Sequence, residues 1–233
     1  MGQLVSGIAH EINNPLFAIL GYSTELLKQI NNPDISKDEL YQRLWEGLET
    51  IGDAAKRCEE ITSRLLAYAR ISSSDKIKID LQEIVEKSMS FLAPQLKLNN
   101  VIVVKNLLCN NPYILGNATE LQQVISNIAL NAIDAMLNGG KITISTYKTD
   151  DRQIGLSIRD TGAGIPRENL DKIFEPFFTT KPKEKSTGLG LAVAHRIIIA
   201  HGGSISVEST IDQGTEFKII LPVFEEEKKD GRD

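Results

Sequence analysis

Residues 7–16, GIAHEINNPL, lie in an apolar pattern that decides the N-terminal fold. Apolar residues recur at alternating three- and four-residue spacing, which predicts a long amphipathic helix with a coiled-coil-like seam. The seam residues are Val5, Ile8, Ile12, Pro15, Ile19, Tyr22 and Leu26. On this helix His10 points away from the seam, towards solvent. The carboxylate of Glu11 could hold the proton of one ring nitrogen, which leaves the other nitrogen as a nucleophile. An exposed histidine without chemistry is the alternative that this pair alone leaves open.

A second long helix follows the first, so the sequence predicts a helical hairpin. Residues 31–34, NNPD, break the first helix, and Ser36 followed three residues later by Glu39 is typical of a helix start. The second apolar seam consists of Leu44, Leu48, Ile51, Ala55, Cys58, Thr62, Leu65 and Ala69. One hairpin of two such helices cannot enclose its own apolar seam, which predicts a homodimer that forms a four-helix bundle.

The periodicity changes after a short polar connector at residues 71–76. The remainder of the chain alternates helical patterns with strands of period two. Helices are expected at residues 81–98, 119–137 and 189–200, and strands at residues 101–107, 141–149, 153–160, 204–209 and 216–221. The sequence therefore predicts a helical-hairpin domain at residues 1–71 and an α/β sandwich domain at residues 77–224.

Composition argues against several classes of function. The chain has 233 residues, a formal net charge of -5 and no basic stripe, so a nucleic-acid-binding protein is not expected. No apolar run reaches the roughly 18 residues of a membrane span, so no membrane contact is expected from this segment. Cys58 and Cys109 lack the paired spacing of zinc ligands and are interpreted as reduced thiols of a cytoplasmic protein.

Polar residues form an unusual row on the helix expected at residues 119–137. The row comprises Gln123, Asn127, Asn131, Asp134 and Asn138, and it opposes an apolar face of Leu121, Ile125, Ile128 and Ala132. A solvated helix face usually carries lysine and glutamate, because asparagine is a poor helix former. An amide row therefore indicates oxygen and nitrogen ligands for something polar, and an ordinary helix surface is the alternative.

A carboxylate ends the apolar face of the strand expected at residues 153–160. Asp160 shares this face with Ile154 and Ile158 by period two, and a carboxylate on the core side of a strand needs a partner. Gly162 and Gly164 follow, and their missing side chains would let a flat ligand approach the backbone. An aspartate that accepts a hydrogen bond from an exocyclic amine fits this pattern, although an ordinary turn would have the same spacing.

A second glycine motif opens the helix expected at residues 189–200. Thr187, Gly188, Leu189 and Gly190 precede it, and lysines including Lys181 lie shortly before them. Glycines at a helix N-terminus offer backbone N–H groups and the positive end of the helix dipole to a phosphate. The segment is not a Walker A loop, because the Gly-x-x-x-x-Gly-Lys-Ser/Thr pattern is missing.

In this order, the motifs resemble the sensor histidine kinases of bacterial two-component systems, over nearly the whole chain. The paired asparagines after His10 are similar to the H box of nitrogen-regulation-type kinases. The further matches are the N box at Asn127 and Asn131, the G1 box at residues 160–164, the F box at residues 174–178, the G2 box at residues 188–190, and glycine-rich elements at residues 201–203 and 214–217.

The resemblance implies a dimerisation and histidine phosphotransfer domain followed by a Bergerat-type ATP-binding domain. His10 would be the phosphoacceptor, Glu11 would orient its ring and take its proton, and the phosphoryl group would pass to an aspartate of a response-regulator receiver domain. His195 and His201 match no acceptor position and are interpreted as structural.

The resemblance also assigns the cofactors, ATP and Mg2+. Asn131 would bind the metal, Asn127 would approach the phosphates and Asp160 would accept the adenine amine. A lid over the triphosphate would comprise Lys181 and the turn at Gly188. The complete set of residues expected at the nucleotide is Asn127, Asn131, Asp160, Gly162, Gly164, Lys181, Thr187, Gly188, Leu189 and Gly190.

Asn14 lies one helical turn after His10 and on the same side of the helix. Its amide could orient a water for attack on the phosphoaspartate of the regulator, and the family associates an amide at this offset with phosphatase activity. The alternative is a structural role in capping a bend at Pro15, which lies inside the helix and donates no backbone hydrogen bond.

The sequence departs from the family pattern in two places. Only nine residues precede His10, so the chain is expected to be a catalytic fragment, the cytoplasmic part of a larger sensor, or a kinase that senses through a partner. Related ATPases place a water-activating glutamate where this chain has Asn127, so slow ATP hydrolysis is expected. The competing hypotheses are a scaffold or phosphatase-biased regulator that uses nucleotide only as a switch, and an ATP-driven clamp, which would require that glutamate.

Overall fold

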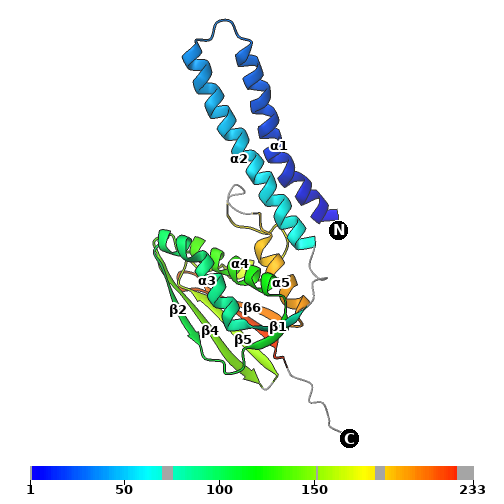
Figure 1. Cartoon of the computed structure of the whole chain (residues 1–233), viewed down its shortest axis with the longest axis vertical. Helices are drawn as coiled ribbons and strands as arrows, with labels where there is room; N and C mark the ends of the chain where they lie inside the picture. The colour runs from blue at the N-terminus through cyan, green and yellow to red at the C-terminus, as the bar shows by residue number, and fades with distance from the viewer. Residues whose placement is uncertain (1, 70–75, 151, 182–186, 225–233) are drawn as a thin grey trace. The chain divides into compact units, whose positions relative to one another are not determined.

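The computed structural model describes residues 2–69, 76–150, 152–181 and 187–224, with side chains described except at residues 2–11, 60, 63–69 and 150. The chain comprises two compact units, which are considered separately: a helical hairpin and an α/β sandwich. The connector expected at residues 71–76 lies almost entirely outside the described residues. The chain trace is coloured from the N-terminus to the C-terminus in Figure 1.

The hairpin consists of α1 (Gly2–Ile30) and α2 (Lys37–Ala69). Ser36 caps α2 as predicted, because its Oγ accepts the backbone N–H of Glu39 at 3.2 Å. The two helices approach closely where Leu26 meets Gly47. A Cβ at Gly47 would lie 2.7 Å from Cδ2 of Leu26, so a larger residue would require the Leu26 side chain to move.

The predicted apolar seams are only partly buried within one hairpin. Pro15 and Leu26 are buried, whereas Tyr22 and Leu48 are exposed, as expected if one hairpin cannot enclose its own seam; Ile61, which was not among the predicted seam residues, is also buried. Helical periodicity cannot separate the face that meets the second helix of the hairpin from a face that is left open.

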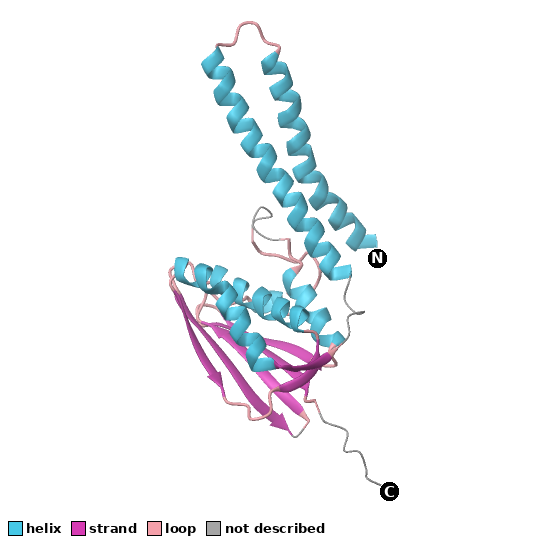
Figure 2. Ribbon diagram, in the orientation of Figure 1, coloured by secondary structure: helices cyan, strands magenta, loops and turns pink. Residues whose placement is uncertain are grey.

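The sandwich unit contains a five-stranded sheet with three helices on one face (Figure 2). The helices are α3 (Leu81–Leu98), α4 (Ala118–Asp134) and α5 (Gly190–Ala200). The sheet strands are β2 (Val101–Leu107), β4 (Gly140–Asp150), β5 (Gln153–Asp160), β6 (Ser204–Thr210) and β7 (Gly214–Pro222). The 3-10 turn η1 (Arg167–Asn169) was not predicted.

The sheet has the order β2-β4-β5-β7-β6, and it is mixed. The β2–β4 pair is parallel, whereas β4–β5, β5–β7 and β6–β7 are antiparallel. The central strand β5 buries Ile154, Leu156 and Ile158 beneath the helices. The predicted α/β sandwich is therefore confirmed, and β5 delivers Asp160 to its end.

Two short strands were missed by the sequence analysis. β1 (Ile77–Asp80) and β3 (Tyr113–Gly116) form a separate antiparallel pair in which Ile77 lies opposite Gly116. Each strand leads directly into a capped helix: Asp80 accepts backbone N–H groups at the start of α3, and Asn117 accepts the N–H of Glu120 at the start of α4.

The end of α4 also differs from the prediction. The helix ends at Asp134 with Ala135 as its C-cap, rather than continuing to residue 137. Asn138 therefore lies in the turn that leads to β4 and is not part of the polar row. Among the described residues, we find no helix with the length and apolar character needed to span a bilayer.

Candidate functional site

The polar row of α4 forms one wall of the candidate site. Opposite it, the apolar face of α4 is buried in the sandwich as predicted. The row residues Gln123, Asn127 and Asn131 are half-buried, while Asp134 is exposed. A half-buried amide retains capacity for hydrogen bonds and coordination, so this face is chemically equipped to hold a polar ligand.

Asn127 joins the amide row to the second glycine motif. Its Nδ2 donates to the backbone O of Gly190, the first residue of α5, at 2.9 Å. The N-cap position is Leu189, which is buried, and within the described ranges no side chain caps this helix end. N–H groups in the first turn of a helix have no intrahelical acceptor, so the start of α5 is a ready anion site beside α4.

The turn before α5 requires glycine at position 188. Gly188 has φ 66°, a left-handed conformation, and its carbonyl accepts the N–H of Phe177 at 3.0 Å. A Cβ at this position would overlap the backbone of Phe177. The F box and the G2 box are thus locked together through their backbones.

Asp160 is 4% exposed and lies at the end of β5. Its Oδ1 accepts two backbone N–H groups, from Gly162 at 2.7 Å and from Thr215 at 3.2 Å. Within the described part of the chain, Oδ2 has no hydrogen-bond donor. Burial raises the pKa of the Asp160 carboxyl above its ordinary value, and the two N–H donors partly offset this shift. The site therefore presents a desolvated carboxylate with one acceptor oxygen unused.

The loop after Asp160 packs against the C-terminal end of α4. The N–H of Ala163 donates to the carbonyl of Ala135 at 3.1 Å. A Cβ at Gly162 would lie 2.7 Å from Cβ of Ala135, so this approach requires glycine. Gly164 has φ 74°, and a side chain there would overlap the carbonyl of Thr210. The glycines that were expected to admit a ligand are therefore also required for the packing of the loop itself.

The turn between β6 and β7 positions this loop, a role that the sequence analysis missed. The N–H of Asp212 donates to the carbonyl of Ala163 at 2.9 Å, and the Oγ of Ser209 accepts the N–H of Ile165 at 2.8 Å. Gly214 has φ 99° and lies against the carbonyl of Asp160. The only sequence signal was the glycine-rich segment at residues 214–217, which says nothing of its contact with a residue more than fifty positions earlier.

The remaining predicted site residues are placed as follows. Thr187 is buried, Lys181 is half-buried, and the N–H of Lys181 donates to Oγ1 of Thr179 at 3.1 Å. His10 and Glu11 lie in α1, but their side chains lie outside the described residues. Asn14 is described and exposed.

The donor set for a metal is sparse. Among the described residues, no group of three or more His, Cys, Asp or Glu side chains is arranged to hold a metal ion. Cys58 and Cys109 are free thiols. Any divalent ion at α4 would therefore depend on amide oxygens such as that of Asn131 and on its own ligand or waters, which is how proteins usually hold Mg2+ with phosphates.

The chain thus combines a helical hairpin with an α/β sandwich. The sandwich carries a row of amide side chains on α4 beside a glycine turn that could bind phosphate. The sequence matches the histidine kinase-, DNA gyrase B- and HSP90-like ATPase family at residues 116–225 and the His Kinase A phospho-acceptor domain at residues 1–74. The chain belongs to the sensor histidine kinases, and its two domains are those of a protein-histidine kinase.

Relatives and solved structures agree with this assignment. Sporulation kinase D of Bacillus subtilis (strain 168) is 37% identical over 224 residues, which cover 96% of this chain and 42% of that kinase. The histidine-protein kinase AtoS of Escherichia coli (strain K12) is 35% identical over 96% of this chain and 35% of its own length. The structure of histidine kinase ThkA in complex with response regulator protein TrrA is similar over 96% of this chain and 62% of that chain, with 26% identity and a TM-score of 0.70. This chain thus spans less than half of the length of these two curated relatives.

Proposed function

We propose that this chain transfers the γ-phosphoryl group of ATP to His10 and then to an aspartate of a response-regulator receiver domain. The observation that carries the proposal is the common wall formed by α4. Gly190 meets this helix at Asn127, and the loop after Asp160 meets it at Ala135. Asn127 and Ala135 are eight positions apart, which corresponds to about 12 Å along the helix. This length suits a nucleotide that lies along the helix.

Adenine binds at the Asp160 end of this wall. Oδ2 of Asp160 accepts a hydrogen bond from the exocyclic amine, since Oδ1 already accepts hydrogen bonds from two backbone N–H groups. The triphosphate extends towards Asn127 and the N-terminus of α5, where backbone N–H groups and the helix dipole favour negative charge. We propose that Thr187, Leu189 and the lid residue Lys181 also bind the triphosphate.

Mg2+ is proposed at Asn131, one turn from Asn127 on α4. The amide oxygen of Asn131 would be the ligand that the protein supplies. A bound ion would supply positive charge that neutralises the phosphates. The chain's own contribution is to hold the nucleotide and the ion in a fixed relation, which is most of what phosphoryl transfer requires of a protein.

At the acceptor, a ring nitrogen of His10 attacks the γ-phosphorus. A nitrogen–phosphorus bond forms, the bond from phosphorus to the β–γ bridging oxygen breaks, ADP leaves, and Glu11 takes the ring proton. An aspartate of the receiver domain then takes the phosphoryl group from the histidine. The complex of ThkA with TrrA supports a response regulator as the partner.

We also propose that Asn14 supports dephosphorylation of the regulator. Its side chain is exposed in α1, and it makes no hydrogen bond to another described residue. The helix continues through Pro15, so a capping role for Asn14 has no support from the contacts described. An exposed amide beside the acceptor is suited to orienting a water.

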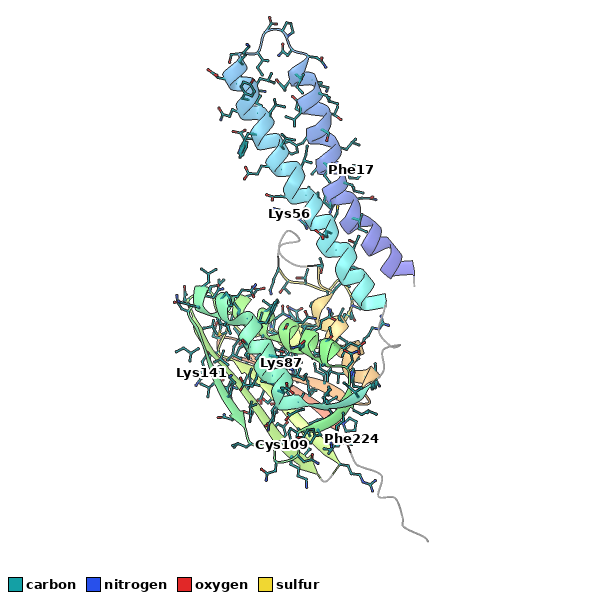
Figure 3. All side chains as sticks on the ribbon, viewed as in Figure 1. Phe17, Lys56, Lys87, Cys109, Lys141 and Phe224 are labelled. Carbon is teal, nitrogen blue, oxygen red and sulfur yellow. The ribbon has the colours of Figure 1, made fainter. Side chains whose placement is uncertain are left out.

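The chain is proposed to act as a homodimer through its hairpin. α1 carries an exposed apolar stripe of Leu16, Phe17, Leu20 and Leu27, and α2 carries Tyr41, Trp45 and Leu48 at helical spacing. Phe17 is 69% exposed and Trp45 is 74% exposed, and the Phe17 side chain is labelled in Figure 3. Apolar stripes of this length favour burial against a second copy.

The proposed domains are residues 1–71 for dimerisation and phosphotransfer and residues 77–224 for catalysis. Their support is that α2 ends at Ala69 and β1 begins at Ile77. A cytoplasmic location is proposed for this segment, because its phosphoryl donor is ATP. The particular resemblance of the H box to nitrogen-regulation-type kinases stays a prediction.

Two competing functions have weaker support. An ATP-driven clamp would need a base at position 127, but the amide of Asn127 is neutral and holds the carbonyl of Gly190. A scaffold that only binds nucleotide would not need His10.

The proposal is tested by incubating the wild-type protein and His10→Gln with γ-labelled ATP. We expect the variant to bind ATP nearly as well as wild type, because acceptor and nucleotide belong to different domains. We also expect it to incorporate no label. Label that remains on His10→Gln would show that another residue is the acceptor.

A further inference from the structure

His201 occupies a polar position in the sandwich with both ring nitrogens engaged. It is the C-cap residue of α5 and is 4% exposed. Its Nε2 accepts the backbone N–H of Asn117 at 3.0 Å, and its Nδ1 lies 2.8 Å from the carbonyl oxygen of Ile197. A backbone N–H only donates and a carbonyl only accepts. The ring is therefore neutral, with its proton on Nδ1.

The hydrogen bond from Asn117 to His201 joins the two helices that border the nucleotide site, and the bond to Ile197 holds the ring at the end of α5. Asn117 is the N-cap of α4, and Ile197 lies in the last turn of α5. A second link, from Asn127 to Gly190, joins α4 to the first residue of α5. The two links are ten residues apart on α4, which is about 15 Å of helix. Together they fix both the spacing and the register of antiparallel α4 and α5.

The site around the ring is built to hold this tautomer. Gly116, the last residue of β3, leaves room for the ring: a Cβ there would lie 2.8 Å from Cδ2 and 3.1 Å from Nε2 of His201. The same Cβ would lie 3.2 Å from Cδ1 of Leu121. The Glu120 carboxylate is 3.9 Å from Nε2, too far for a hydrogen bond. Nε2 of His201 therefore accepts its hydrogen bond from the N–H of Asn117.

We propose that His201 is a positioning residue for nucleotide binding. By tying the start of α4 to the end of α5, it sets where Asn127 and Asn131 stand relative to the turn that begins α5. The inference rests on the proposed ATP-binding function and goes beyond it, because it assigns a role to a histidine that touches neither the nucleotide nor the reacting atoms. His195 differs, since its ring lies against Phe174 with centroids 5.3 Å apart.

The proposal is tested with matched variants and a non-hydrolysable ATP analogue. His201→Phe keeps a planar ring but loses both hydrogen bonds, whereas the amide oxygen of His201→Gln can reach the Asn117 N–H. We expect His201→Phe to raise the Kd for the analogue roughly tenfold, and His201→Gln to recover most of this loss. The ATP concentration for half-maximal labelling should rise by the same factor, with the rate at saturating ATP much less affected. His195→Phe is the control on the same helix and should leave the Kd unchanged.

Gly116→Ala tests the same link without altering the histidine. Its Cβ should push the ring off the Asn117 N–H and raise the Kd, and it should add nothing in a His201→Ala background. An additional loss in that background would mean that the substitution acts through Leu121. In the wild-type protein, imidazole nitrogen shifts by NMR should report a protonated Nδ1 and an unprotonated Nε2.

Three outcomes separate the possibilities. If His201→Phe and Gly116→Ala both fold and bind the analogue as wild type does, the positioning role is refuted, even if their Tm values fall. If His201→Phe does not fold, Gly116→Ala decides the question by the same criterion: binding of the analogue as tight as in wild type refutes the positioning role, and a raised Kd supports it. A wild-type protein that binds no analogue at all would contradict the proposed function instead.

Discussion

Replacing Asp160 with asparagine changes one atom at the proposed adenine contact and leaves the local packing in place. The side-chain oxygen of the introduced amide is expected where Oδ1 now accepts the N–H groups of Gly162 and Thr215. The amide nitrogen then replaces Oδ2. Two donors, the adenine amine and the new amide, would face each other. Asp160→Asn should therefore weaken ATP binding without disturbing the loop.

The size of the effect follows from the lost interaction. A hydrogen bond to a charged group contributes about 1.5–3 kcal/mol. At about 1.4 kcal/mol for each tenfold change in affinity, Asp160→Asn should weaken ATP binding roughly 10- to 150-fold. The variant also removes a buried carboxylate whose ionisation is disfavoured, so the Tm of the nucleotide-free protein at neutral pH should not fall.

Calorimetry with two nucleotides isolates the contact. Purine riboside triphosphate lacks the exocyclic amine but keeps the ring and the phosphates. The wild-type protein should prefer ATP over this analogue, and Asp160→Asn should lose the preference. If the variant discriminates between the two nucleotides as strongly as wild type, Asp160 does not contact the amine, and its assignment to the adenine site is refuted.

The same carboxylate predicts a pH dependence. The pKa of Asp160 in the free protein is raised by burial, and binding of an amine donor favours the ionised form. ATP affinity should therefore be constant above the raised pKa and fall as the pH drops through it. Asp160→Asn has no carboxyl to titrate at this position, so it serves as the control: any pH dependence that it retains arises from other groups, such as the phosphates of ATP. Parallel profiles for the two proteins would refute the assignment.

Three further predictions concern the metal, the dimer and the phosphatase activity. Asn131→Ala should remove the gain in ATP affinity that Mg2+ provides, because a methyl group cannot coordinate it, and calorimetry with and without EDTA would measure this. The wild-type protein should be a dimer by light scattering at micromolar concentration, and Phe17→Glu with Trp45→Glu should make it monomeric; Phe91→Glu, a similarly exposed phenylalanine on α3, should not. Asn14→Ala should autophosphorylate almost normally but dephosphorylate its regulator far more slowly, and a parallel loss of both activities would contradict its assigned role.

Much of the fold follows from local pattern. The bounds expected for the helix at residues 81–98 and the strand at residues 101–107 agree with α3 and β2, because strong periodicity and clear breaks mark them. Period two along β5 also predicted that Asp160 would end an apolar face, and its burial confirms this. Positions on one element were thus accessible from sequence.

What the sequence could not provide are contacts between distant segments. β1 and β3 are four-residue strands that pair with each other. Four residues are too few for an alternation of apolar and polar residues to identify a strand from sequence. The N–H of Thr215 that holds Asp160 is a backbone group, which no residue type announces. His201 was interpreted as structural because it matches no acceptor position, and its two hydrogen-bond partners could not be foreseen, since both are backbone atoms. Sequence motifs mark the residues proposed to bind the ligand, whereas the packing that positions them appears only in three dimensions.

The chemical stability of the label on the wild-type protein tests the central claim most directly. After incubation with γ-labelled ATP and Mg2+, the labelled protein is divided and exposed to acid or to base. Transfer to His10 predicts a nitrogen–phosphorus bond, so the label should be lost in acid and survive base. A label that survives acid, or the absence of any label on a protein that binds ATP, would contradict the account.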